Sequence, residues 1–285
     1  MIIKEMSEIQ TSPPVAKLPP KIAELLARHG DLALSKAEAI LAQARPCIYV
    51  TSERVSQSPM RRGLFGRILG LPVVSPVLSS TASKFGGTPY VSQPHDLDLE
   101  GCSFLGQVNF ADLPRSVPEL PKEGILVIDW PLHSSMMWPR TRYYADPDPA
   151  KCLLSGAQSV GYYEARLVFR FGWSLPAGRE WFDAIPAGDP DLWTAWNEWN
   201  PAGYNDDEYC HRIGGNRSAG LDNHYGFAPQ PGRSSDIRDY EMLLRITFDN
   251  DADFAFGTNC LYVIIHHRDL ADGRLDQAVA TGANY

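Results

Sequence analysis

The chain of 285 residues is 44% hydrophobic and 21% charged, a composition typical of a globular protein with the length for one large domain or two intimate halves. Its charge is uneven, because residues 1–80 carry 10 basic and 6 acidic side chains whereas residues 81–285 carry 16 and 28. An acidic body argues against a nucleic-acid partner, since phosphate binding needs a basic face, and no apolar stretch is long enough to span a bilayer.

The acidic body would instead attract a basic protein partner, although the same charge also suits a surface that only aids solubility. Five cysteines are spread along the chain without a C-x-x-C pair, which argues against a disulfide framework. The first residues lack the basic start and apolar core of a secretory signal. We therefore expect a cytoplasmic protein.

The elements begin with a flexible N-terminal arm at 1–20, which is polar and holds four prolines. Apolar residues then recur with helical spacing over 22–44 and are interrupted at Gly30, which predicts two helices. The run 47–51 is β-branched and aromatic and predicts a strand. Residues 60–70 are both basic and apolar and predict a surface insertion. Residues 21–82 should thus form a helical lead-in, a strand and an insertion, ahead of a body at 83–285.

The body is dominated by predicted strands. Apolar or alternating runs predict them at 104–110, 124–128, 162–171, 243–248 and 260–265. Short helices are predicted at 179–185 and 191–199, and a closing helix at 269–279. Strands outnumber helices and do not alternate with them, which indicates an α+β fold of mostly antiparallel sheets with an N-terminal helical lead-in.

Two similar stretches organise this body. Residues 83–90 and 211–217 each contain a basic residue, an apolar residue and two glycines, 128 positions apart, and each is followed by two of the predicted strands. We interpret them as two degenerate repeat modules, at about 83–130 and 211–265.

The ordered motifs also carry a family resemblance. The first module contains Lys84-Phe85-Gly86-Gly87-x-Pro89, Phe104-Leu105-Gly106-Gln107-Val108-Asn109-Phe110 and Leu120-Pro121-Lys122-Glu123-Gly124-Ile125-Leu126. The second contains His211-Arg212-Ile213-Gly214-Gly215 and Asp239-Tyr240-Glu241-Met242-Leu243-Leu244-Arg245-Ile246. Over residues 80–280 the chain resembles the YwqG-like family, a bacterial family of unknown function. The resemblance implies an α+β fold without an established activity, and some members look like parts of toxin–immunity neighbourhoods.

The paired glycines are candidates for an anion site, with backbone amides as donors and nearby basic side chains as charge partners. A site between the two modules would be lined by Lys84, Gly86, Gly87, Gln107, His211, Arg212 and Gly215. The structural alternative is that Gly-Gly permits a turn with positive φ or a close backbone approach. The sequence has no Walker or G-x-G-x-x-G motif, so it predicts no nucleotide cofactor.

Cysteine and histidine residues do not follow the spacing of a zinc site, and the acidic run 249–253 lacks the glycine and glutamate of a calcium loop. No metal is therefore predicted. A nucleophilic pair of Cys210 with a histidine lacks a supporting signature.

Aromatic and acidic residues mark a candidate partner-binding stretch. Trp193, Trp196 and Trp199 recur every three residues and precede Asp206-Asp207-Glu208. On a helix the tryptophans would form one face, either packed in the core or exposed as an interface anchor. We predict a non-enzymatic protein-binding module, in its most specific form an immunity-type neutraliser of a basic toxin domain. The alternative is a small-molecule binder or unrecognised enzyme with a site between the modules.

Overall fold

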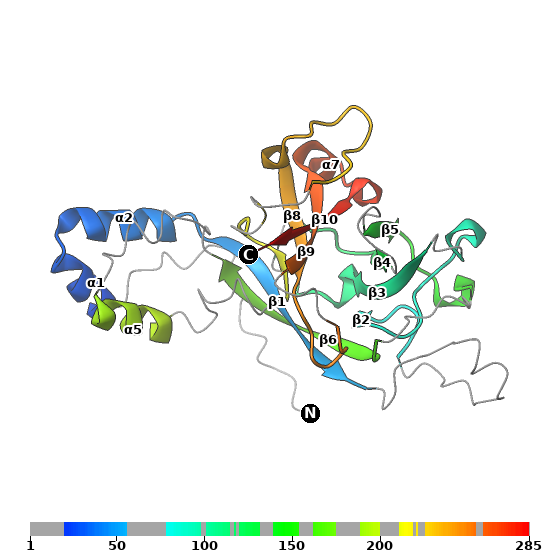
Figure 1. Cartoon of the computed structure of the whole chain (residues 1–285), viewed down its shortest axis with the longest axis horizontal. Coiled ribbons are helices and arrows are strands. Elements are labelled where there is room, and N and C mark those ends of the chain that lie inside the picture. The colour runs from blue at the N-terminus through cyan, green and yellow to red at the C-terminus, as the bar shows by residue number, and fades with distance from the viewer. Residues whose placement is uncertain are drawn as a thin grey trace, which may run out of the picture.

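The computed structural model (Figure 1) describes a single antiparallel sheet of ten strands. The described residues are 20–55, 78–97, 101–114, 117, 120–131, 139–153, 162–174, 189–199, 211–218, 221, 226–254 and 259–284. The strands are β1 (Arg45–Arg54), β2 (Lys84–Phe85), β3 (Cys102–Asn109), β4 (Ile125–Pro131), β5 (Arg140–Tyr144), β6 (Ala165–Ser174), β7 (His211–Gly214), β8 (Tyr240–Ile246), β9 (Asn259–His266) and β10 (Val279–Asn284).

The strand order is β10-β9-β8-β7-β1-β6-β2-β3-β4-β5, which reads symmetrically about the central pair β1–β6. These two strands pair along their full length, from Arg45 opposite Ser174 to Arg54 opposite Ala165. Four strands follow on either side. The sheet curls until its edges meet. At this junction the Thr141 hydroxyl on β5 donates to the carbonyl oxygen of Ala278, just before β10, at 2.6 Å. The result is a nearly closed, barrel-like sheet.

The main core fills the inside of this curled sheet and draws side chains from strands of both halves, for example Val50, Ile128 and Val263. Two further clusters cover the outer face. One lies over β3, β4 and β5, and the other lies over β8 and β9. Strands β4 and β9 are therefore buried on both faces, which explains why each reads as a continuous apolar run rather than an alternating one.

Four short helices are present among the described residues: α1 (Pro20–Ala27), α2 (Asp31–Leu41), α5 (Pro190–Trp199) and α7 (His267–Ala271). Short 3-10 turns are η1 (Pro94–Leu97), η2 (Phe110–Asp112), η3 (Pro149–Lys151), η5 (Ile237–Asp239) and η6 (Leu275–Gln277). Helix α1 packs against both α2 and α5, and the three form a helical lobe that stands away from the sheet (Figure 1). In the described part of the chain, none of the helices combines the length and the apolar character needed to cross a bilayer.

The predicted α+β fold is wrong. The chain builds one nearly closed antiparallel sheet with a few short helices, and not several sheets balanced by helices. The two halves join in one sheet because β1 and β6 are each ten residues long and pair directly. The N-terminal helices do form, but α1 packs on α2 and on α5 from far along the chain, so these helices belong to a lobe of their own.

The predicted closing helix is also much shorter than expected. Helix α7 ends at Ala271, because Gly273 takes φ +69°, a left-handed conformation that ends a helix. The chain then makes η6 and turns into the edge strand β10. The helix predicted at 179–185 lies outside the described residues, as do the insertion predicted at 60–70 and the first 19 residues.

Candidate functional site

Two glycine turns end β2 and β7, and they share one backbone conformation. Gly86 and Gly87 have φ of 59° and 74°, and Gly214 and Gly215 have φ of 65° and 83°. Side chains rarely adopt these left-handed angles, so both turns require glycine. The structural reason for the paired glycines thus holds in both modules.

The two turns lie toward opposite ends of the central strand pair. Phe85 is opposite Ala165, which is opposite Arg54, whereas Gly214 is opposite Cys47. Seven residues of β1 therefore separate them, roughly 23 Å at about 3.3 Å per residue. The structure groups Lys84, Gly86, Gly87 and Gln107 at one turn, and Arg212 and Gly215 at the other. A ligand role for either group remains a prediction.

At the first turn, Lys84 is fully buried and its charge is compensated. Its Nζ donates to the Ser79 carbonyl at 2.9 Å and lies 3.5 Å from the Glu164 carboxylate, which is fully buried too. Burial lowers the pKa of Lys84, and the Glu164 charge opposes that effect. The Glu164 side chain also lies against Gly87, where a Cβ would come within 2.8 Å of its Cδ.

Gln107 uses its whole amide to hold the chain on both sides of this turn. Its Oε1 accepts from the Tyr90 amide at 2.7 Å, and its Nε2 donates to the carbonyls of Ser80 and Ala82 at 2.7 and 2.8 Å. Asn109 Nδ2 donates to the carbonyl between them, that of Thr81. Together with Lys84, these amides bind the four carbonyls of residues 79–82. The polar residues of the first motif therefore have a structural role.

His211 belongs to the inside of the sheet. Its Nδ1 accepts from the Thr247 amide at 3.1 Å, so Nε2 carries the proton and donates to Asp249 at 2.8 Å. The hydrogen bond from His211 lowers the pKa of Asp249 below its ordinary value, although burial acts in the opposite direction. Phe85 meets the ring edge-on at 4.9 Å. Both ring nitrogens are engaged, which leaves neither to activate a nucleophile.

At the second turn, Arg212 is 3% exposed and lies on the outer face of β7. Its Nη2 donates to the Asn216 carbonyl at 2.6 Å, and its buried Nε has no hydrogen-bond partner. The residue opposite on β8 is Arg245, which is fully buried, and the residue opposite on β1 is Tyr49. Two arginines therefore face each other across adjacent strands beneath the surface.

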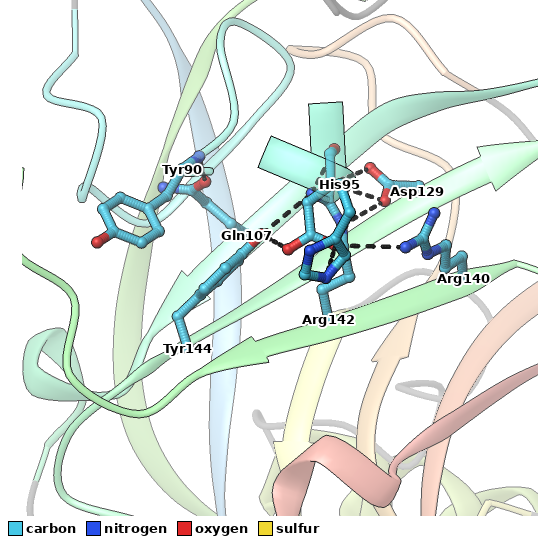
Figure 2. A network of polar contacts seen from close by, with 8 residues as sticks. Tyr90, His95, Gln107, Asp129, Arg140, Arg142 and Tyr144 are labelled. Carbon is cyan, nitrogen blue, oxygen red and sulfur yellow. Dashed lines mark hydrogen bonds and ion pairs between the residues drawn. The ribbon is translucent and has the colours of Figure 1, made fainter. Parts of the chain in front are cut away.

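A further polar network, unforeseen from the sequence, lies on the outer face of β4 and β5 (Figure 2). Arg142 holds Asp129 with two hydrogen bonds of 2.9 and 3.0 Å, and Asp129 is fully buried. Arg142 also reaches the Tyr144 hydroxyl, which donates to Asp96 Oδ2 at 2.7 Å. Arg140 bonds the other Asp96 oxygen at 3.3 Å. The network fastens η1 to the sheet.

Burial raises the pKa of Asp129 to about 6, and the Arg142 charge counteracts part of that rise. The sequence gives one indication of this network, namely that Asp129 is a charged residue directly after the apolar run 125–128. Its partners come from η1 and β5, and sequence spacing gave no indication that these would meet it. The exposed His95, with 76% of its side chain accessible, lies 3.7 Å from Asp96 at the edge of the network.

The predicted partner-binding tryptophans Trp193, Trp196 and Trp199 are positions of α5, in the helical lobe. Asp189 caps this helix, because its Oδ1 accepts from the amides of residues 191 and 192 at 3.0 and 2.9 Å. Its Oδ2 lies 2.7 Å from His29 Nε2, which ties α5 to the chain just after α1. The acidic residues Asp206, Asp207 and Glu208 lie outside the described residues.

Comparison with known families places the chain in a family. A family model described as Domain of unknown function (DUF1963) matches residues 83–282, from just before the first glycine turn to β10. The chain belongs to this family. The match includes both glycine turns, the Asp129 network and α5, and begins after α1, α2 and β1. Comparison with curated proteins gave no match.

Proposed function

We propose that this DUF1963 protein acts by binding another protein, with the helical lobe as the contact surface. In its most specific form the proposal is an immunity-type neutraliser of a basic toxin domain, in line with the resemblance of its motifs to YwqG-like proteins. The cytoplasm is the proposed compartment. Support for it comes from Cys47, Cys102, Cys152 and Cys260, which are the free cysteines among the described residues.

The observation that carries the proposal is where α5 lies. The ten-stranded sheet forms its own core, and the helical lobe stands outside that core (Figure 1). Helix α5 brings three tryptophan positions to this lobe, and α2 adds Leu32, whose exposed fraction is 70%. Tryptophan is enriched at the centres of protein interfaces.

The acidic character of residues 81–285 indicates what charge the proposed partner carries. Residues 81–285 carry 16 basic and 28 acidic side chains, and the acidic run 206–208 follows α5 closely in the sequence. Opposite charge steers association and suppresses partners of like charge. A basic partner is therefore favoured over an acidic one.

The test is affinity purification of the tagged full-length protein from its own cells, followed by intact-mass analysis. We expect a stoichiometric basic protein that dissociates at high salt. Replacing Asp206, Asp207 and Glu208 by lysine should weaken its binding at least about tenfold. The matched control replaces three exposed acids on the sheet side of the molecule, Glu123, Asp146 and Asp276, by lysine.

The control variant should keep most of the affinity, because its charge change is equal but lies elsewhere. Purification without any stoichiometric protein, or equal losses in the two variants, would contradict the proposal. We favour this proposal over the second candidate, a small-molecule binder with one site between the modules, because the two glycine turns lie toward opposite ends of β1. Only the second turn retains a specific observation in its favour, the orphaned donor on Arg212.

A further inference from the structure

The two glycine turns differ in how the basic residue before them is neutralised. Lys84 and Arg212 hold equivalent places, each two residues before the first glycine and each buried. Lys84 lies 3.5 Å from the carboxylate of Glu164. The corresponding place at the second turn can be found from the strand register.

By strand register, Cys47 at the second turn corresponds to Glu164 at the first turn. Lys84 is opposite Arg166, and Glu164 lies two residues before that partner. Arg212 is opposite Tyr49, and Cys47 lies two residues before that partner. The contacts are similar but not identical, because a Cβ on Gly87 would lie 2.8 Å from Glu164 Cδ, whereas a Cβ on Gly215 would meet Ser174 Oγ first and then Cys47 Cβ at 2.8 Å.

The second turn therefore has a thiol where the first turn has a carboxylate. Within the described part of the chain, Arg212 donates to the Asn216 carbonyl, and its buried Nε has no hydrogen-bond partner. Arg245, which is also buried, is the residue directly across the strand pair. A buried guanidinium with an unsatisfied donor is costly unless an anion compensates it.

We propose that Arg212 binds the oxyanion of a small molecule, a phosphate or a carboxylate, at the second glycine turn. The bound group lies beside the Arg212 Nε–H, which donates to it, and supplies the negative charge that Glu164 supplies at the first turn. Guanidinium groups match both oxyanions in geometry and charge. Fully buried Cys47 leaves the position uncharged, so the counter-charge comes from the ligand.

The test follows thermal unfolding of the full chain in inorganic phosphate and in citrate, each against chloride at equal ionic strength. For wild type we expect the midpoint to rise by about 3–6 °C once the anion is tenfold above its Kd. Arg212→Gln should abolish the rise. Arg238→Gln is the control, because that guanidinium is 81% exposed and pairs with Asp236, so the response should persist.

A second pair of variants keeps the proposal testable if Arg212→Gln fails to fold. Cys47→Asp, close to cysteine in size, supplies an internal carboxylate, and it should raise the midpoint in chloride while removing the response to phosphate. Cys47→Asn, equal in size but uncharged, should keep the response. Loss of stability in Cys47→Asp together with an unchanged response would overturn the proposal.

The rival source of counter-charge is an acidic side chain of this same chain. Neutralising the acidic run, as Asp206→Asn, Asp207→Asn and Glu208→Gln together, should leave the phosphate response equal to that of wild type. If neither anion stabilises wild type, the proposal fails. If phosphate stabilises only the neutralised variant, the chain supplies its own anion and the proposal fails as well.

Discussion

Asp129 and Lys84 are buried charges that are held by partners from elsewhere in the sheet. The Asp129 carboxylate on β4 receives two hydrogen bonds from Arg142 on β5, and Lys84 on β2 lies beside Glu164 at the start of β6. Breaking such a pair leaves a charge without compensation in a region of low dielectric. The Asp129 network has a further consequence, because its carboxyl group titrates near pH 6.

We expect Asp129 to make the stability of the protein fall as pH rises from about 4 to about 6. The unfolded chain ionises this group near its ordinary pKa of 3.8, whereas the folded chain holds the proton until about pH 6. The folded state therefore binds more protons in this window, and the free energy of unfolding declines by up to ~1.4 kcal/mol per pH unit. Urea unfolding across this range measures the slope.

The variant Asp129→Asn should flatten that slope, whatever it does to the absolute stability, because the titrating group is gone. Asp146→Asn, at an exposed position after β5, is the matched control and should leave the slope unchanged. If the profiles of wild type and Asp129→Asn run parallel from pH 4 to 6, the assignment of the raised pKa to Asp129 is refuted.

At the scale of elements, the glycine turns decide where β2 and β7 stop. Gly86 brings the chain against the backbone of Tyr163, so that a Cβ there would overlap its carbonyl oxygen. Gly273 also has a positive φ, but a Cβ there would meet no atom within 4 Å. Substitutions at Gly86 and Gly273 therefore distinguish two contributions to the free energy of unfolding. Both change the strain of a positive φ, but only the one at Gly86 adds a clash with a neighbouring backbone.

Gly86→Ala should therefore destabilise the fold by at least about 3 kcal/mol, since it adds a backbone clash to the strained angle. Gly273→Ala should cost only about 1 kcal/mol, because the angle alone is strained. Chemical denaturation of both variants checks the difference. Equal losses would mean that close approach is not what requires glycine at the first turn.

Most strands could be predicted from the sequence, since a strand buried on both faces has an apolar run whatever its partners are. Run 124–128 falls within β4 except for its first residue, and run 260–265 falls within β9, for this reason. The closing helix was misjudged because residues 274–284 carry no strong alternation, and β10 is fixed by pairing with β9. Pairing is a long-range contact that local propensity does not contain.

At the scale of the whole molecule, closure joins the two halves at a second place. The centre is held by the β1–β6 pair, and the edges are joined by the hydrogen bond from Thr141 to the carbonyl of Ala278. Edge strands with unpaired backbone groups tend to fray or to pair with other chains. The bond from Thr141 should therefore protect β10.

Thr141→Val should remove this bond at nearly constant volume, cost about 1–2 kcal/mol of stability, and speed the hydrogen exchange of β10 amides. Thr51→Val, at an exposed position of β1, is the control and should change neither quantity appreciably. Unchanged exchange in β10 after Thr141→Val would show that the two edges are held together by other contacts.

The sequence by itself determined the local features of this protein: the apolar strands, the paired glycines, the acidic body and the helical stretch that carries Trp193, Trp196 and Trp199. Tertiary structure decided which of them meet. It placed Gly86 and Gly214 toward opposite ends of β1, bound Gln107 to the chain around the first turn, and assembled Asp129 with Arg142 from different strands. Local patterns follow from each residue's own propensity and burial, whereas a site depends on strand pairing and curvature, which arise only when the whole chain folds.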